Sequence, residues 1–404
     1  MIRLLLIGIL LIAGEIHGNG QTDAAGRLLM KARYQVSGKM YGEALRTIDN
    51  SQSVGPEASR AALTMGQALS GLKRYDESNR WLMQVTGDGL ADAAYAMAKN
   101  YIALNDNHSA IESLRKHLAE KNHYPEKTIR LDPDFAKLEN ERNWVHLWQT
   151  DWYSESEQQA AEFDYLLANN QVVEAMALAN RFRTAYPDDP RGWFLLAKAH
   201  HAMKDDWQFR LSMDHGTPLA AQNNPLMEEM LRLCMEAEYF NKANVLASQL
   251  IRNDPTNPDY QISRALIRIM EGKESLAIKE IAATEEAGIA PAELYYQAGQ
   301  RVAKSIPFQA ESWFTKAIDG GRLDARYYFA RGLARISLEK TDEALSDFAM
   351  SLDINPNQPD LYATRAQIRL DIGDNDGACH DWKKAMEMGN TKAADLLYKY
   401  CRLP

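Results

Sequence analysis

Residues 331–356 read RGLARISLEKTDEALSDFAMSLDINP, and the pattern returns with a period of 34 in residues 365–390 as RAQIRLDIGDNDGACHDWKKAMEMGN. Both segments open with Arg and a small residue. Both also carry an alanine that is followed four residues later by an aromatic side chain, as with Ala344 and Phe348. A fixed period of this length is the signature of stacked helical repeats. The sequence therefore predicts a helical solenoid.

The period continues through most of the chain. Seven anchors follow one another at intervals of 34, 34, 34, 33, 34 and 34, namely Ala175, Phe209, Ala243, Ala277, Ala310, Ala344 and Ala378. A fainter version precedes them, with Ala44, Ser78 and Ala110 at intervals of 34 and 32. Each repeat holds two runs with apolar residues three and four apart, as amphipathic helices require. Because one helix pair cannot bury its apolar face alone, neighbouring pairs must stack.

Three further features accompany the anchors. These are small residues 12 positions before them (Ala298, Gly332, Ala366), prolines 12 positions after them (Pro187, Pro255, Pro356) and W-x2-L-A at residues 193–197. Together they resemble the tetratricopeptide repeat, whose pattern runs W-x2-L-G-x2-Y, A-x3-F and then Pro. The resemblance implies an all-α fold, a right-handed α-α superhelix in two blocks, and binding to protein partners. Residues 382–397 also look similar to the SEL1-like branch of helical repeats.

We expect five segments along the chain. They are a signal peptide over residues 1–20, an N-terminal block of about three repeats over 24–122, a tryptophan-rich helical closing segment over 123–156, a C-terminal block of about seven repeats over 157–390, and a capping helix over 391–404.

Residues 1–20 carry the features of a secretory signal. Arg3 supplies a positive start, residues 4–13 are apolar, and Gly18 and Gly20 offer cleavage sites. The apolar run is too short to span a membrane, and no cysteine precedes Cys234, which excludes a lipoprotein anchor. We predict an exported protein, periplasmic or secreted, which is not an integral membrane protein after cleavage. The alternative is an uncleaved membrane anchor.

Composition and motifs narrow the function class. A net charge of −9 and the lack of a long basic run argue against nucleic acid as a partner. The nucleotide-binding, zinc-protease and hydrolase motifs are all absent, and the three cysteines lack metal-ligand spacing. We therefore expect no enzyme activity, no cofactor and no metal site. The sequence gives no indication of the oligomeric state.

Two sets of residues predict cross-links inside the repeats. Arginine and an acid recur at a spacing of 16, in Arg264 with Glu280, Arg331 with Asp347, and Arg365 with Asp381. We interpret these as ion pairs between the two helices of a repeat, and the alternative is an arginine ladder for an acidic ligand. Cys379 and Cys401 lie 11 before and 11 after Asn390, where a turn is expected, so an antiparallel helix pair would join them in a disulfide. Cys234 should be a buried thiol.

Residues 123–156 interrupt the period. Trp144, Trp148 and Trp152 lie four residues apart there, which predicts one helical stripe. The stripe is either a hydrophobic plug between the two blocks or an exposed surface for a partner or a sugar.

The resemblance places the binding groove on the first helix of each repeat. Mapped onto this chain, its apolar residues include Phe194, Ile262, Leu266, Tyr295, Phe329 and Leu333. Such a groove suits an apolar helix or an extended peptide, unless these residues pack against neighbouring helices. We therefore expect a non-enzymatic adaptor for envelope proteins that uses the groove, the tryptophan segment or both. The alternative is a periplasmic receptor for a small ligand or glycan.

Overall fold

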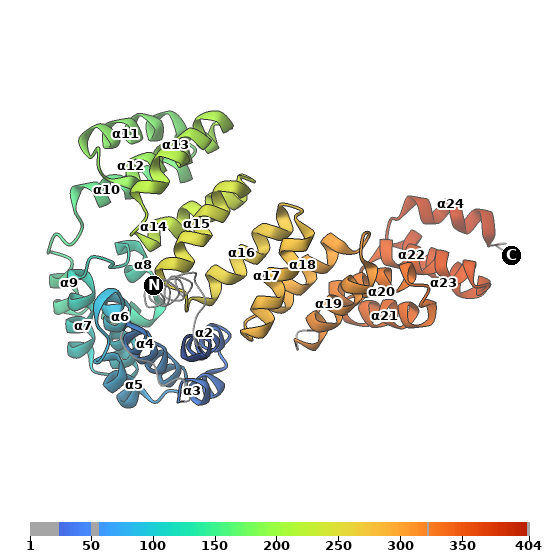
Figure 1. Ribbon diagram of the computed structural model, residues 1–404, viewed down its shortest axis with the longest axis horizontal. Coiled ribbons are helices and arrows are strands. Elements are labelled where there is room, and N and C mark those ends of the chain that lie inside the picture. The colour runs from blue at the N-terminus through green and yellow to red at the C-terminus, as the bar shows by residue number, and fades with distance from the viewer. Residues whose placement is uncertain (1–23, 50–55, 321–322, 402–404) are drawn as a thin grey trace, which may run out of the picture. The chain divides into compact units, whose positions relative to one another are not determined.

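A computed structural model describes residues 24–49, 56–320 and 323–401. This part of the chain is helical and contains no strand, which confirms the predicted all-α helical-repeat fold (Figure 1). The predicted signal segment over residues 1–20 lies outside the described residues. The chain forms two compact units, which we call unit 1 (residues 1–264 and 287–289) and unit 2 (265–286 and 290–404). This division falls inside the predicted C-terminal block.

Unit 1 begins with three helix pairs and a closing segment. The pairs are α2 (Ala24–Ser37) and α3 (Tyr41–Asp49), α4 (Pro56–Gly71) and α5 (Tyr75–Leu82), and α6 (Leu90–Ala103) and α7 (Asn107–Ala119), with the short η2 (Gly87–Gly89) before α6. The closing segment holds only short helices, namely α8 (Glu126–Arg130), η3 (Pro133–Leu138) and α9 (Arg142–Leu147).

Regular pairs then resume. Those of unit 1 are α10 (Glu155–Ala168) and α11 (Val172–Ala185), α12 (Pro190–Ala202) and α13 (Asp206–Leu219), and α14 (Asn224–Glu236) and α15 (Phe240–Asn253). The helix α16 (Pro258–Met270) begins in unit 1 and ends in unit 2. Unit 2 continues with α17 (Glu274–Glu286), α18 (Ala292–Val302), α19 (Pro307–Asp319), α20 (Ala325–Ser337), α21 (Thr341–Ile354), α22 (Pro359–Asp371), α23 (Asn375–Glu387) and α24 (Thr391–Tyr400).

The turn inside each pair has a recurring backbone signature. A residue with positive φ lies five positions before nearly every anchor, at Lys39, Lys73, Asn105, Asn170, Lys204, Glu238, Gly272, Glu339 and Gly373. Such a residue ends a helix because its left-handed conformation lets the next amides bond the last free carbonyls. Ser305, five positions before Ala310, lacks this conformation. The repeat from Ala277 to Ala310 is one residue shorter than the period of 34, and its turn therefore has a different backbone conformation.

Small residues let the paired helices approach closely. The anchors Ala44, Ala175, Ala344 and Ala378 are fully buried. On the first helix of a pair, a Cβ added at Gly332 would overlap the ring of Phe348. Protein interiors are close-packed, so a methyl group at such a crossing would force the helices apart. The small residues in the sequence pattern are therefore packing requirements.

Ion pairs join the helices of the last two pairs at the predicted spacing. Asp347 accepts hydrogen bonds from Arg331 at 2.7 Å and from Arg335 at 2.8 Å. Asp381 accepts from Arg365 at 2.7 Å and from Arg369 at 3.0 Å in the same way. Because both carboxylates are buried and held by two arginines each, they belong to the core. The pairing of Arg264 with Glu280 stays a prediction.

The C-terminal helix is attached covalently. Cys379 of α23 and Cys401, which follows α24, form a disulfide with their Cα atoms 5.7 Å apart. The apolar face of α24, with Leu397, packs on Trp382 beneath it. Cys234 is a buried free thiol in α14, and burial raises its pKa to about 12. It is therefore protonated at neutral pH and unreactive.

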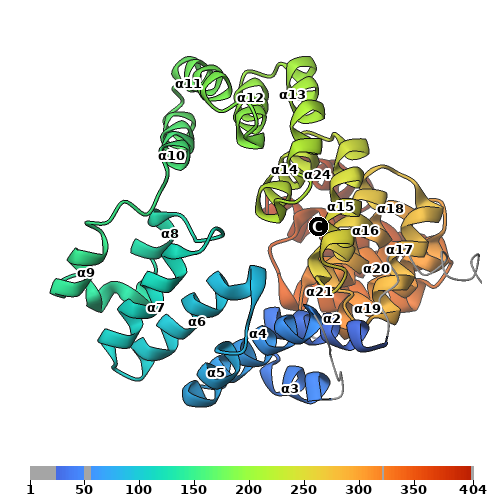
Figure 2. The ribbon, with the colours of Figure 1, turned by 60° about the vertical axis from the view of Figure 1, so that its left-hand side comes forward.

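Within unit 1, the first and last pairs meet. Arg33 of α2 donates hydrogen bonds to Asp254 at 2.7 Å and to Thr256 at 2.8 Å, and Arg60 of α4 lies 3.4 Å from the same carboxylate. Burial raises the pKa of Asp254, but Arg33, Arg60 and the hydroxyl of Thr256 together outweigh it and hold the pKa below its usual value. Unit 1 therefore forms a closed arc from α2 round to α15, which Figure 2 shows.

Candidate functional site

The tryptophan segment differs from its predicted form. The helix α9 ends at Leu147, so Trp144 is helical, Trp148 caps the helix end and Trp152 lies in the following loop. The indole N–H of Trp152 donates a 2.7 Å hydrogen bond to the carbonyl of Leu147. This bond satisfies a carbonyl at the helix end, where no further turn follows. The prediction of one continuous helical stripe was wrong.

The three tryptophans have different surroundings. Trp144 is 4 % exposed and packs in the core of the closing segment with Phe135 and Leu147. Trp148 and Trp152 are half-buried and lie against the edge of that core. Trp144 therefore has the role of a hydrophobic plug, whereas the other two reach a surface.

That surface is a groove of about 830 Å³ inside unit 1, which we call the Trp groove. One wall comes from the closing segment and carries Leu131, Trp148, Trp152 and Tyr153. The other wall comes from the first helices of three consecutive pairs, with Gln158 on α10, Phe194 on α12 and Glu229 on α14 among its residues. Trp148 and Trp152 of the tryptophan segment and Phe194 of the predicted repeat groove thus line one cavity.

The remaining predicted groove residues lie elsewhere. Ile262 belongs to unit 1, and Leu266, Tyr295, Phe329 and Leu333 belong to unit 2, so their alignment in one groove stays a prediction. Leu266 and Tyr295 are half-buried and pack on the core formed by α16 to α19. Phe329 packs on the core around Phe348, whereas Leu333 is 41 % exposed.

Cations cover the aromatic rings of the Trp groove. The guanidinium of Arg130 lies 5.2 Å from the centre of the Trp148 ring, and the ammonium of Lys198 lies 5.5 Å from that of Phe194. Each cation also contacts a carboxylate, Glu126 for Arg130 and Asp164 for Lys198. The groove thus presents charges of both signs beside apolar surface.

Sequence reasoning missed the loop that joins α7 to the closing segment. The backbone N–H of Tyr124 donates to His117, and its carbonyl accepts a 2.8 Å hydrogen bond from the hydroxyl of Tyr153. The ring of His123, on the same loop, packs edge-on against Tyr153 at 5.0 Å. The available signal was His117 itself, which lies seven residues after the anchor Ala110 and hence on the buried face of its helix.

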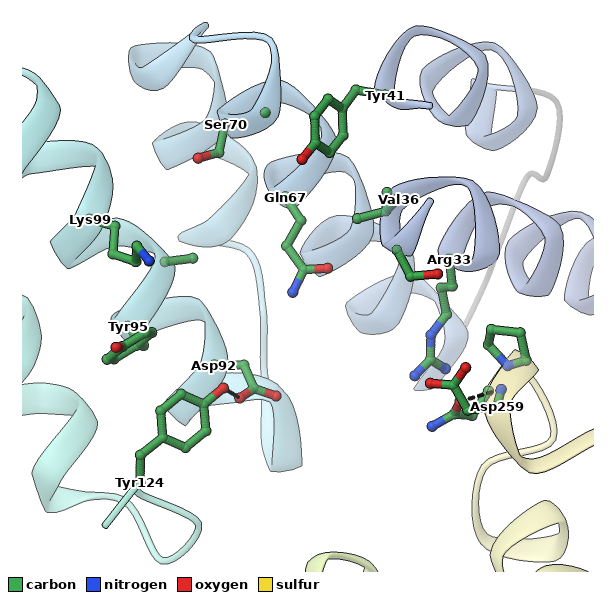
Figure 3. A pocket seen from close by; sticks show the side chains of 15 residues that line it. Arg33, Val36, Tyr41, Gln67, Ser70, Asp92, Tyr95, Lys99, Tyr124 and Asp259 are labelled. Carbon is green, nitrogen blue, oxygen red and sulfur yellow. Dashed lines mark hydrogen bonds between the residues drawn. The ribbon is translucent and has the colours of Figure 1, made fainter. Parts of the chain in front are cut away.

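A second cavity of about 530 Å³ lies on the inner face of α2, α4 and α6 (Figure 3). The charged groups of Arg33, Asp92 and Lys99 in this cavity already have partners within the chain. Lys99 lies 2.7 Å from Asp134, and the Tyr124 hydroxyl donates to Asp92 at 2.6 Å, as Figure 3 shows for the latter. Burial, followed by the nearby Asp92 carboxylate, raises the pKa of Tyr124, so its hydroxyl stays a donor. The paired groups make this cavity a weaker candidate than the Trp groove.

Residues 24–49, 56–320 and 323–401 contain neither a cluster of metal ligands nor a membrane-spanning helix. In this part of the chain no three His, Cys, Asp or Glu side chains gather as a metal ion requires. No helix within it has the length and apolar character needed to cross a membrane.

Comparison with known proteins identifies one repeat directly. Residues 325–358, which form α20, α21 and the turn after them, match the model of the family described as tetratricopeptide repeat. A curated relative, the "DnaJ homolog subfamily C member 7 homolog" of Dictyostelium discoideum, is 22% identical over 202 residues. The match covers 44% of this chain and 38% of that relative, so the chain spans well under half of the relative's length.

Solved structures with a similar arrangement have TM-scores below one half. The C-terminal part of a TPR repeat-containing protein from Cytophaga hutchinsonii has a TM-score of 0.46 at 17% identity, covering 58% of this chain and 98% of that one. The APC/C hetero-tetramer Cut9-Hcn1 has a TM-score of 0.38 at 12% identity, with 92% and 83% covered. The SEL1-like resemblance stays a prediction. The repeat over residues 325–358 thus matches the tetratricopeptide repeat model.

Proposed function

We propose that this protein is an exported, non-enzymatic scaffold that holds an extended segment of a protein partner in the Trp groove. The observation that carries the proposal is the meeting of Trp152 and Phe194 on opposite walls of one cavity. Tetratricopeptide repeats bind protein partners in general, and tight interfaces concentrate their binding energy in aromatic and arginine side chains. The partner would belong to an envelope assembly, secretion or surface complex.

The lining favours a peptide as the occupant. A peptide offers apolar side chains for Leu131 and Trp152, and charged side chains for the ion pairs at Arg130 and Lys198. Exposed ion pairs contribute little to stability, so a partner's charges can replace Glu126 at little cost. Peptide recognition by grooves of this kind relies on a few anchor side chains set in pockets.

The glycan alternative has less support. Sugars stack on open aromatic faces, but Trp144 is in the core and Arg130 covers the ring of Trp148. The indole N–H of Trp152 is already bonded to Leu147. No observation favours a small-ligand receptor over a peptide-binding scaffold.

Two independent features support the proposal that the protein is exported. The apolar stretch over residues 4–13 has the length and flanks of a signal-peptide core. Cys379 and Cys401 are joined in a disulfide, a bond that persists in oxidising compartments such as the periplasm. Both support a periplasmic or secreted location.

A matched pair of double variants tests the groove. Leu131→Ala with Trp152→Ala removes one Leu and one Trp from the groove wall, whereas Leu211→Ala with Trp207→Ala removes the same types from α13. Trp207 is 73% exposed and lies outside the groove. The partner is first identified by a photo-cross-linker at Gln158 in the native host, and its cross-linked segment is synthesised as a peptide.

We expect the groove variant to bind this peptide about tenfold to a hundredfold more weakly, which is the range for losing hot-spot side chains, and the α13 variant to bind within about twofold. Circular dichroism checks that both keep the helical content of the native protein. Equal affinity for the native protein and the groove variant would remove the Trp groove as the partner site.

A further inference from the structure

His117 of α7 is completely buried, and both of its ring nitrogens are in use. Nδ1 lies 2.8 Å from the carbonyl oxygen of Ala91, and Nε2 lies 2.8 Å from the backbone nitrogen of Tyr124. A carbonyl can only accept a hydrogen bond and a backbone N–H can only donate one. The imidazole is therefore neutral and carries its proton on Nδ1, because Nε2 must accept.

Tyr124 connects this imidazole to the Trp groove. Its N–H is held by His117, and its carbonyl accepts the hydroxyl of Tyr153 at 2.8 Å. Tyr153 lines the groove directly after Trp152 in the chain. The position of Tyr153 in the groove wall thus depends on the backbone of Tyr124, which His117 holds through its N–H while Asp92 holds its hydroxyl.

We propose that protonation of His117 loosens the groove wall formed by Trp152 and Tyr153 and so weakens partner binding in acid, an inference that rests on the proposed function of this groove. The doubly protonated ring carries an N–H on Nε2 as well, and that N–H would point at the N–H of Tyr124. Two donors cannot share a hydrogen bond, so the loop carrying Tyr124 must move. Tyr153 then loses the fixed carbonyl to which its hydroxyl donates.

The surroundings of the ring set the direction of its titration. Burial lowers the pKa of His117 most strongly, and the charge of His123 on the loop acts in the same sense. The hydrogen bond to the Ala91 carbonyl and the carboxylate of Asp92 on α6 oppose this lowering without cancelling it. The rings of Tyr95 and Tyr124, at 5.3 Å and 4.8 Å, complete the enclosure. The switch therefore lies on the acid side of pH 6.5. An exported protein meets the pH of its surroundings directly.

Fluorine NMR of the full-length protein labelled with 5-fluorotryptophan reads the groove without any partner. Trp152→Phe assigns the Trp152 resonance. We expect this resonance to shift reversibly as the pH falls below 6.5 in the native protein, because burial lowers the pKa of His117. His117→Gln should hold it at its neutral-pH position, since an amide donates and accepts without titrating. His108→Gln, at an exposed position on α7 outside the groove, should leave the titration unchanged.

A resonance that does not move with pH, or that moves equally in His117→Gln, would overturn the proposal. Should His117→Gln not fold, Tyr153→Phe provides the second test. Without the hydroxyl bond, the Trp152 resonance should already be displaced at neutral pH and should respond less to acid, and an unaltered titration in Tyr153→Phe also overturns the proposal.

The affinity for the partner peptide, measured at neutral and at acid pH, then distinguishes a failure of this inference from a failure of the proposed function. We expect the synthetic partner peptide to bind about tenfold more weakly in acid, as the loss of one buried hydrogen bond implies, and His117→Gln to remove that difference. A groove that titrates through His117 but binds the peptide at neither pH would remove the proposed function and leave the conformational switch standing.

Discussion

Phe194 of unit 1 and Phe329 of unit 2 occupy the same position in their repeats, yet their surroundings differ. Phe194, although only 5 % exposed, is in the lining of a groove of about 830 Å³ to which the closing segment also contributes. Phe329 packs on Phe348 of its own helix pair, with the ring centres 6.0 Å apart. A pocket within unit 2, lined by Arg268 and Trp313 among others, has no room for a water molecule. The interruption of the repeat therefore supplies one wall of the Trp groove.

The ion pairs of unit 2 and of the Trp groove also differ in how deeply they are buried. In unit 2, Asp347 and Asp381 are buried and each joins two arginines of its own helix pair. In the Trp groove, the pair of Arg130 and Glu126 is about half exposed. Buried pairs fix helices, whereas exposed pairs can exchange partners.

The largest effect should come from breaking a buried pair in unit 2. Asp381→Ala leaves Arg365 and Arg369 without their shared carboxylate, so the free energy of unfolding of this unit should fall by about 3 to 5 kcal/mol. Glu387→Ala is the control, because its pair with Lys384 is about half exposed and should contribute less than about 1 kcal/mol. Urea denaturation followed by circular dichroism measures both. Equal losses would contradict the assignment of Asp381 to the core.

The disulfide comes next in size. Replacing Cys379 and Cys401 by Ser opens a loop of 22 residues, which should reduce the free energy of unfolding by about 3 kcal/mol. Thermal melts of the native protein with a reductant should match those of the double variant, which itself should not respond to the reductant. A native melting curve that is insensitive to reduction would show that α24 is held by packing alone.

One added methyl group at a helix contact in unit 2 should reduce stability by less than the two changes above. Gly332→Ala places a Cβ against the ring of Phe348, and overpacking of this kind costs about 1 to 3 kcal/mol. Gly42→Ala of unit 1 meets no atom closer than 4.0 Å, so it should gain up to about 1 kcal/mol from helix propensity. Urea titrations should therefore give changes of opposite sign, and two losses would contradict the packing argument.

The smallest predicted effect is that the stability of unit 1 depends on pH through His117, whereas that of unit 2 does not. Because burial lowers the pKa of His117, the unfolded chain takes up a proton more readily than the folded one. The contribution of His117 to stability is thus complete above pH 6.5, declines as the pH falls below 6.5 and is lost below the folded pKa. Hydrogen exchange of peptides from α6 and α7, corrected for intrinsic rates, should accelerate over that range. Peptides from α20 and α21 should not change, and His117→Gln should remove the effect.

Much of the fold could be predicted because the same residue spacings recur in successive repeats. The anchors Ala344 and Ala378 indicated the register, and one recurring spacing indicated the pairs of Arg331 with Asp347 and Arg365 with Asp381. Ser154 and Glu157 form a capping box at the start of α10, a motif that four consecutive residues define. These features are local, so a single sequence reveals them.

The site could be predicted only in part, because it depends on contacts between distant segments. Trp152 and Phe194 were both singled out, but nothing in the sequence places them in one cavity. The end of α9 at Leu147 depends on a side-chain bond from Trp152 that periodicity does not encode. The ion pair of Arg33 with Asp254, which are 221 residues apart, likewise has no local signal. The role of His117 follows from its two hydrogen-bond partners, which only the structure supplies.

The most direct test compares the two units as binding surfaces in one experiment. A photo-cross-linking amino acid is placed at Gln158 in the Trp groove or at Leu333, which is 41 % exposed on α20 of unit 2. Each variant is then exposed in the native host, and the cross-linked residues of the partner are identified by mass spectrometry. We predict one partner segment at Gln158, competed by its synthetic peptide, and none at Leu333. The same segment captured at Leu333 and not at Gln158 would contradict the Trp groove as the binding site.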